Sequence, residues 1–136
     1  MINTALLNNN ELKKLQAEVA AWKQTLTSRM EANVLLKNML SDVLKNNYDQ
    51  NYLEEIEEFQ TKFIQEDEKT NVLRKQVTDL DNLLSGKTFN DRIISESFEE
   101  IMKRFRNDFT HSRNRFRFLV SSFADFHYKI YGKNEN

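Results

Sequence analysis

Residues 98–130 read FEEIMKRFRNDFTHSRNRFRFLVSSFADFHYKI, and the spacing of the large apolar side chains in this stretch decides the fold. They recur in steps of three and four residues, which is the spacing of a helix that packs against other helices. The stripe consists of Ile94, Phe98, Ile101, Phe105, Phe109, Ser112, Phe116, Leu119, Phe123, Phe126 and Ile130. Two consecutive four-residue steps, from Ile101 to Phe105 to Phe109, predict a stutter with local unwinding of the supercoil.

Two earlier stretches of the chain repeat this spacing. The first stripe comprises Leu12, Leu15, Val19, Trp22, Leu26, Leu36, Leu40 and Val43, and the second comprises Tyr52, Ile56, Phe59, Phe63, Leu73, Val77, Leu80 and Leu84. A polar run separates the two stripes, and Gly86 follows the second, as is typical of a helix end. We therefore predict helices over residues 10–46, 51–85 and 89–131.

The composition agrees with long helices, because the 136 residues include no proline and only two glycines. Short connections between the predicted helices make neighbours antiparallel. We predict an all-α fold, an antiparallel up-down-up three-helix bundle of long coiled-coil-like helices, as a single domain over residues 1–136. The same stripes would also be satisfied if the third helix packed into a second chain.

Charge and cysteine content narrow the functional classes. The net charge is -1, from 20 basic and 21 acidic residues, so overall electrostatics does not attract the chain to nucleic acid or to an anionic membrane. Cysteine is absent, which removes disulfide and thiol chemistry. No apolar run approaches the roughly 18 residues of a membrane span, and residues 1–7 lack the basic start of a signal peptide. We expect a cytoplasmic protein with no membrane partner.

Polar residues interrupt all three stripes near their middle. Folding the chain about the loop near residues 47–48 places position 29 opposite position 66, and folding about Lys87 places position 66 opposite position 108. One polar layer is therefore expected at a single level of the bundle. Its candidate members are Arg29, Asn33, Glu66, Thr70, Asp108 and His111.

The candidate layer has two interpretations. It is either a buried ion cluster that penalises a shift in helix register, or a small polar pocket that binds an anion or a metal. A metal site is not expected, because only Asp108-x-x-His111 resembles a ligand pair and the charge of Arg29 opposes a cation. The chain also has no glycine-flanked serine elbow, G-x-S-x-G, and no glycine-rich phosphate loop. The sequence therefore predicts no cofactor and no catalytic residue, and hence not an enzyme.

The third predicted helix carries a basic stretch interleaved with phenylalanines, which is one pattern of nucleic-acid binding. Its basic residues are Lys103, Arg104, Arg106, Arg113, Arg115 and Arg117. The acidic block Glu54–Glu58 is expected to lie beside residues 113–117 and to pair with them. Internal pairing is thus the preferred interpretation, and weak nucleic-acid binding is an alternative.

Large side chains outside the stripes suggest a further contact surface. The candidates are Phe118, Val120, Tyr128 and Tyr131, all in the second half of the third predicted helix. They predict a homodimer or a groove for a protein partner. We therefore expect a non-enzymatic helical bundle that acts by protein–protein interaction or self-assembly, and a ligand-binding bundle is the alternative.

Overall fold

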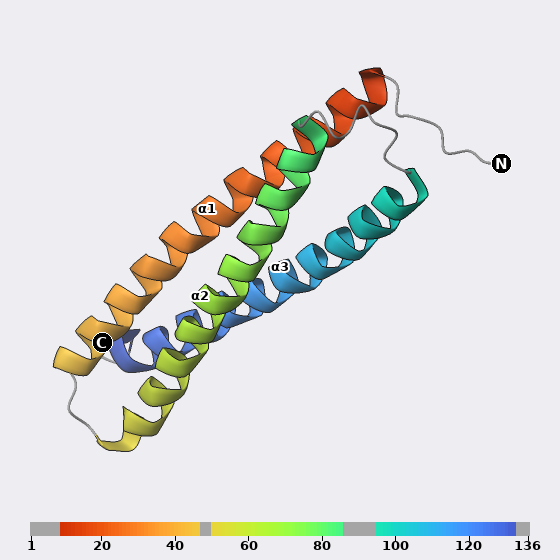
Figure 1. Ribbon diagram of the computed structural model, residues 1–136. Coiled ribbons are helices and arrows are strands. Elements are labelled where there is room, and N and C mark those ends of the chain that lie inside the picture. Colours follow the sequence, from red (N-terminus) through yellow and green to blue (C-terminus); the bar gives the residue numbers. More distant parts are fainter. Residues whose placement is uncertain (1–8, 47–49, 86–94, 133–136) are drawn as a thin grey trace.

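The computed structural model describes residues 9–46, 50–85 and 95–132, and the described chain forms three long helices (Figure 1). They are α1 (Asn9–Asn46), α2 (Gln50–Ser85) and α3 (Ser95–Tyr131). The predicted starts of the first two helices, residues 10 and 51, each lie one residue after the observed start. Their predicted ends, residues 46 and 85, agree with the structure. The predicted end of the third at residue 131 is also correct, whereas its predicted start at residue 89 lies outside the described residues.

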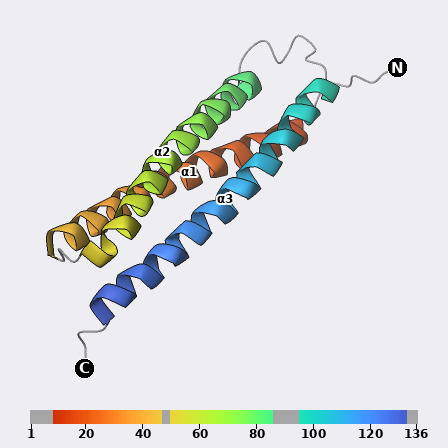
Figure 2. The same cartoon turned by 90° about the horizontal axis from the view of Figure 1, so that it is seen from below.

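The three helices form the predicted antiparallel bundle. α1 and α2 make a hairpin, and α3 runs beside it in the same direction as α1 (Figure 1 and Figure 2). The third helix therefore packs against the first two helices of its own chain. None of the described helices has a stretch both long and apolar enough to cross a membrane.

The inward face of α3 differs from the prediction at one position. Met102 is fully buried, whereas Ile101 is 42% exposed. With Met102 in the stripe, the inward positions alternate regularly between four-residue and three-residue steps from Phe98 to Ile130. The predicted stutter at Ile101 was therefore wrong, because the side chain that faces the core is the next one along the helix.

The helices are not equally close to one another. The backbones of α1 and α2 approach each other along much of their length, whereas α3 stands further away from both. The inward positions of α3 are mostly phenylalanines, while the buried positions of α1 and α2 include smaller side chains such as Val19, Thr70 and Val77. Larger side chains at a helix contact hold the axes further apart.

The core consists of two apolar clusters separated along the bundle axis. The first cluster contains Val19, Trp22, Leu26, Leu73, Val77, Leu80, Leu84, Phe98, Met102, Phe105 and Phe109. The second cluster contains Leu40, Val43, Ile56, Phe59, Phe63, Leu119, Phe123, Phe126 and Ile130. Between the two lie the buried polar residues Arg29, Asn33, Glu66, Thr70 and Ser112. The polar interruptions in the stripes therefore do converge, and they divide the core in two.

Candidate functional site: the polar layer and the surface of α3

Arg29 is the most buried cation of the polar layer. It lies on the inward face of α1 with 6% of its surface exposed. Its Nη1 donates a hydrogen bond of 2.5 Å to Ser112 Oγ on α3. Its guanidinium carbon also lies 5.5 Å from the ring centre of Phe109 and 5.7 Å from that of Phe116. Two aromatic rings and one hydroxyl group thus surround the charge, and cation–π contacts of this kind are stabilising.

The electrostatic surroundings of Arg29 are mostly unfavourable for a cation. Burial lowers the pKa of Arg29, and the positive charges of Arg115 and Arg113 lower it further, while the charge of Glu66 raises it. An arginine nevertheless remains protonated in proteins, because its ordinary pKa lies far above neutrality. The layer therefore holds a permanent positive charge in the interior of the bundle.

Glu66 is the acidic group of the layer, and it is paired with Arg115. Arg115 Nε donates to Glu66 Oε2 at 2.8 Å, and Arg115 Nη2 donates to Glu66 Oε1 at 3.3 Å. The Glu66 side chain is 4% exposed and that of Arg115 is 38% exposed. Arg115 therefore covers a buried carboxylate from the solvent side, in the two-pronged geometry that arginine favours.

Asn33 joins α1 to α2 in the same layer. Its Nδ2 donates to the main-chain oxygen of Phe63 at 2.9 Å and to Asp67 Oδ1 at 2.7 Å. Asp67 is also ion-paired with Lys37. The Oδ1 of Asn33 is buried and has no hydrogen-bond partner among the described residues. Both donors of this amide are thus used, but its acceptor is not.

The sequence prediction of the layer requires a correction on α3. Arg29, Asn33, Glu66 and Thr70 are all buried as expected, but Asp108 and His111 are exposed. Their places are taken by Ser112 and Arg115. The reason is that α3 meets the level of Arg29 and Glu66 four to seven residues later than a turn centred on Lys87 implies. Ser112 was recognisable as a polar member of the stripe. Arg115 was marked only as part of the basic stretch, and its pairing with Glu66 in the layer was not predicted.

The predicted contact surface on α3 divides into two pairs. Phe118 is 73% exposed and Tyr128 is 72% exposed. Val120 and Tyr131 are half-buried, and the Tyr131 ring lies 4.6 Å from that of His127. Phe118 and Tyr128 therefore point outward, while Tyr131 packs against its own helix and the second core cluster.

Two residues of the basic stretch of α3, Arg106 and Arg115, form ion pairs inside the molecule, but among the described residues no ion pair joins this stretch to the acidic block Glu54–Glu58 as expected. Arg106 binds Glu18 of α1 through two hydrogen bonds of 2.8 Å, and these bonds raise the pKa of Arg106. Glu55 in the acidic block pairs with Lys129 rather than with residues 113–117. The same difference in register between α3 and α2 explains this change, since it moves every residue of α3 relative to α2.

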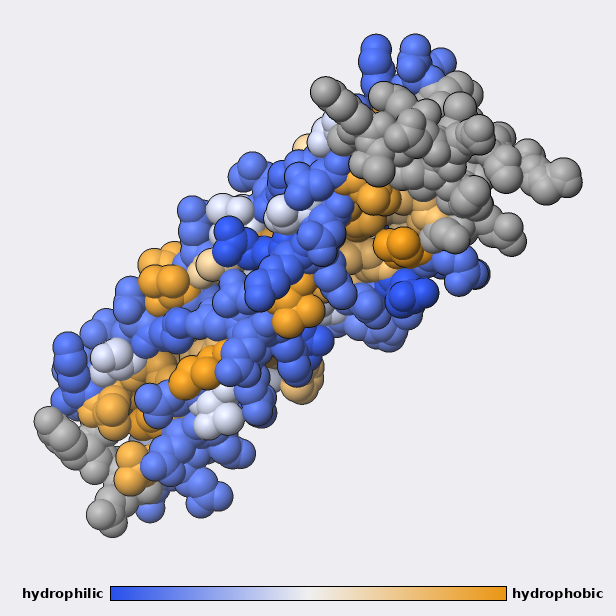
Figure 3. All heavy atoms as spheres, viewed as in Figure 1, coloured by the Kyte–Doolittle hydropathy of each residue, from blue (hydrophilic) through white to orange (hydrophobic). Residues whose placement is uncertain are grey.

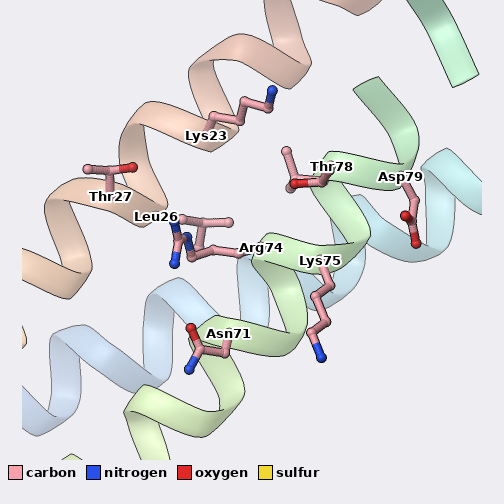
Figure 4. Close-up of a pocket in the computed structure, with 9 residues that line it drawn as sticks. Lys23, Leu26, Thr27, Asn71, Arg74, Lys75, Thr78 and Asp79 are labelled. Atoms are coloured by element: carbon pink, nitrogen blue, oxygen red, sulfur yellow. The ribbon is translucent and has the colours of Figure 1, made fainter. Parts of the chain in front are cut away.

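A wide groove between α1 and α2 has a volume of about 720 Å³ (Figure 4). Arg74 extends from α2 toward α1, whereas Lys75 and Asp79 point away from α1. Lys23 at its edge is already paired with Asp81 at 2.5 Å. All polar side chains that line this groove are exposed, so none of them is held in a defined position by the core.

Within the described helices, no three histidine, aspartate or glutamate side chains gather in a way that suits a metal ion. No protein-family model, curated protein or solved structure matches the chain. The interpretation of function therefore depends on the polar layer and the exposed face of α3.

Proposed function

We propose that the chain is a non-enzymatic helical-bundle protein that acts by self-assembly, as a homodimer formed through the outward face of the last turns of α3. This dimer face consists of Phe118, Ser121, Ala124, Asp125 and Tyr128. The cytoplasmic location expected from the sequence is part of the same proposal, and fractionation of the host cell tests it.

The exposure of Phe118 and Tyr128 is the observation that supports the proposal most. On the face visible in Figure 3, hydrophobic side chains form separate patches among hydrophilic ones. Phe118 and Tyr128 have the largest exposed fractions among the large hydrophobic side chains of the described helices. Because aromatic rings contribute strongly to interface energy, two of them on one outward helix surface favour a contact with another protein.

The residues between the two rings favour close approach of a second helix. Ser121, Ala124 and Asp125 lie between Phe118 and Tyr128 on the outward half of α3 and are exposed. A ring of a second copy would fit beside the small side chains of Ser121 and Ala124. A helix face on which large and small residues alternate in this way fits against a second copy of the same face when the two helices are antiparallel.

The charges on this part of α3 favour a second copy over an unrelated partner. Arg117 and Asp125 are both exposed and have opposite charges. A two-fold axis near residues 121–123 brings Phe118 of one copy toward Tyr128 of the other. An axis at residue 121 would place Arg117 of each copy opposite Asp125 of the other, and an axis at 123 would place Phe118 opposite Tyr128, so one axis between the two brings both pairs to within about half a helical turn. A symmetric interface therefore gains both apolar and charge complementarity.

The test is the oligomeric state of matched variants, measured by native mass spectrometry and sedimentation. We expect the wild-type protein to be a dimer and Phe118→Glu to be a monomer with unchanged helical content. The control is Leu35→Glu, because Leu35 is also exposed but lies on α1; this variant should remain a dimer. A monomeric wild-type protein, a dimeric Phe118→Glu variant, or a second protein bound in place of the second copy would each contradict the homodimer.

A further inference from the structure

A second groove lies between α2 and α3 and opens beside the polar layer. Its volume is about 310 Å³, close to the lower limit for small-ligand sites. We call it the Ser112 groove, after the buried serine that lines it. The other lining residues that matter for binding are Lys69, Val72, Leu73, Asp108 and Arg115.

The Ser112 groove is backed by a buried positive charge that the protein neutralises only in part. A guanidinium group has five N–H donors. In the described structure Arg29 uses one of them, toward Ser112 Oγ, and it has no carboxylate within ion-pair distance. The nearest acid of the layer, Glu66, is occupied by Arg115. Because a buried charge without a close counter-ion is unfavourable, the position favours an anion nearby.

The hydroxyl group of Ser112 keeps a proton that it can donate in a hydrogen bond. Its Oγ accepts the hydrogen bond from Arg29, so its own hydroxyl proton remains to be donated. Ser112 is almost completely buried, but it still lines the groove. The contact with a cation also makes the hydroxyl group a stronger donor, because hydrogen bonds in a chain polarise one another. The serine at the floor of the groove therefore retains a hydroxyl proton to donate.

The rim of the groove supplies further donors. Arg115 uses Nε and Nη2 to bind Glu66, which leaves its Nη1 for a ligand. Lys69 forms no ion pair with another described residue. Asp108 is the one acid among the groove's lining residues, against the cations Lys69 and Arg115. With Arg29 behind the floor, the groove has more positive than negative charge around it.

Apolar side chains complete the Ser112 groove. Leu73 is buried and Val72 is exposed, and both lie on α2 beside the cationic rim. An inorganic anion, which has no apolar group, would leave this apolar surface uncovered. An anion attached to a small apolar group would cover it, and burial of apolar surface contributes to affinity.

We infer that the Ser112 groove binds a small organic oxyanion, such as a phosphate monoester. The Ser112 hydroxyl group and the Lys69 and Arg115 cations hold the oxyanion, and the apolar group lies against Val72 and Leu73. Arg29 acts through Ser112, because it fixes and polarises the hydroxyl group. This inference is independent of the dimer face, which lies further along α3.

Titration with two probes at constant ionic strength tests the site. Phenyl phosphate is expected to bind with one molecule per chain, and inorganic phosphate is expected to bind more weakly, because it has no apolar group. Calorimetry gives the affinity, and amide chemical shifts of the labelled protein locate the site. The shifts should be largest around Lys69 and Ser112.

Two variants test the site, and a third is the control. Ser112→Ala and Lys69→Met should each weaken the binding of phenyl phosphate by about tenfold, as expected for the loss of a hydrogen bond to a charged group. Lys75→Met should leave the affinity unchanged, because Lys75 also lies on α2 but does not line the Ser112 groove. Circular dichroism confirms that each variant is folded before its affinity is compared.

Several results would overturn the inference. One is that neither phenyl phosphate nor inorganic phosphate binds the wild-type protein. Another is equal affinity of the wild-type protein, Lys69→Met and Ser112→Ala. Should Ser112→Ala fail to fold, Lys69→Met and the chemical shifts of the wild-type protein still decide the matter, since shifts confined to other grooves contradict the site.

Discussion

Asn33 of α1 is tied to the backbone of α2, because its Nδ2 donates a hydrogen bond of 2.9 Å to the main-chain oxygen of Phe63. A main-chain oxygen inside a helix normally accepts only the bond of its own helix. The Asn33 side chain therefore recognises one particular level of its neighbour. A single buried asparagine of this kind specifies register in helical bundles at a cost in stability.

Replacement of Asn33 by leucine tests this role. The two side chains have the same branching and number of heavy atoms, and leucine removes the buried oxygen that lacks a partner. We expect the free energy of unfolding in urea to stay the same or to rise by about 1–3 kcal/mol, the usual cost of an unsatisfied buried polar group. We also expect faster amide exchange in α2, because other registers become accessible.

Asn38→Leu is the control for this experiment, because Asn38 is exposed on the same helix. It should change the free energy of unfolding by less than about 0.5 kcal/mol and leave amide exchange unaltered. A loss of more than about 2 kcal/mol in Asn33→Leu would show that its two hydrogen bonds outweigh the unpaired oxygen.

A double-mutant cycle on Glu66 and Arg115 should show strong coupling. Arg115→Met leaves the Glu66 carboxylate buried without its partner, and we expect a loss of about 2–3 kcal/mol in the free energy of unfolding. This value is below the range for fully buried pairs, because Arg115 is partly exposed. The double variant Glu66→Leu/Arg115→Met should recover most of the loss.

The same cycle on Arg29 and Glu66 provides the comparison. Arg29 bonds to Ser112 and not to Glu66, so its coupling to Glu66 acts only through space. We expect a smaller interaction energy for Arg29→Met with Glu66→Leu than for the Arg115 pair. Equal coupling in the two cycles would show that the polar layer acts as one network rather than as separate pairs.

Two phenylalanines of α3 should differ sharply in their contribution to stability. Phe123 is buried and packs edge-on against Phe63, with 5.3 Å between the ring centres. Phe123→Ala should reduce the free energy of unfolding by about 3–5 kcal/mol, because it leaves a cavity. Phe118→Ala should change it by less than about 0.5 kcal/mol in the monomer.

Thermal unfolding of both variants at low protein concentration measures this difference. A large loss in Phe118→Ala under these conditions would show that Phe118 packs within its own chain, and it would also contradict the dimer face.

The ion pair between Arg106 and Glu18 should contribute little to stability despite its good geometry. Its side chains are 47% and 32% exposed, so solvent screens the interaction. We expect Arg106→Gln to reduce the free energy of unfolding by less than about 1 kcal/mol, and by less still at high salt. A loss that is large and independent of salt would contradict this expectation.

Most of the helical structure could be predicted from the sequence, because periodicity and the absence of helix breakers are local properties. The ends of the first two helices were predicted to within one residue. The choice between Ile101 and Met102 could not be predicted reliably, since both are apolar and adjacent. Only the packing of α3 against the other helices buries Met102 and leaves Ile101 exposed.

The sequence alone determined the three helices, their antiparallel order and the presence of polar residues halfway along the stripes of α1 and α2. Only the tertiary structure decided which residues of α3 complete that layer. The stripes repeat every few residues, so α3 can bury its apolar side chains at several levels along the hairpin. The packed bundle selects one of them, and at that level Ser112 and Arg115, rather than Asp108 and His111, meet Arg29 and Glu66.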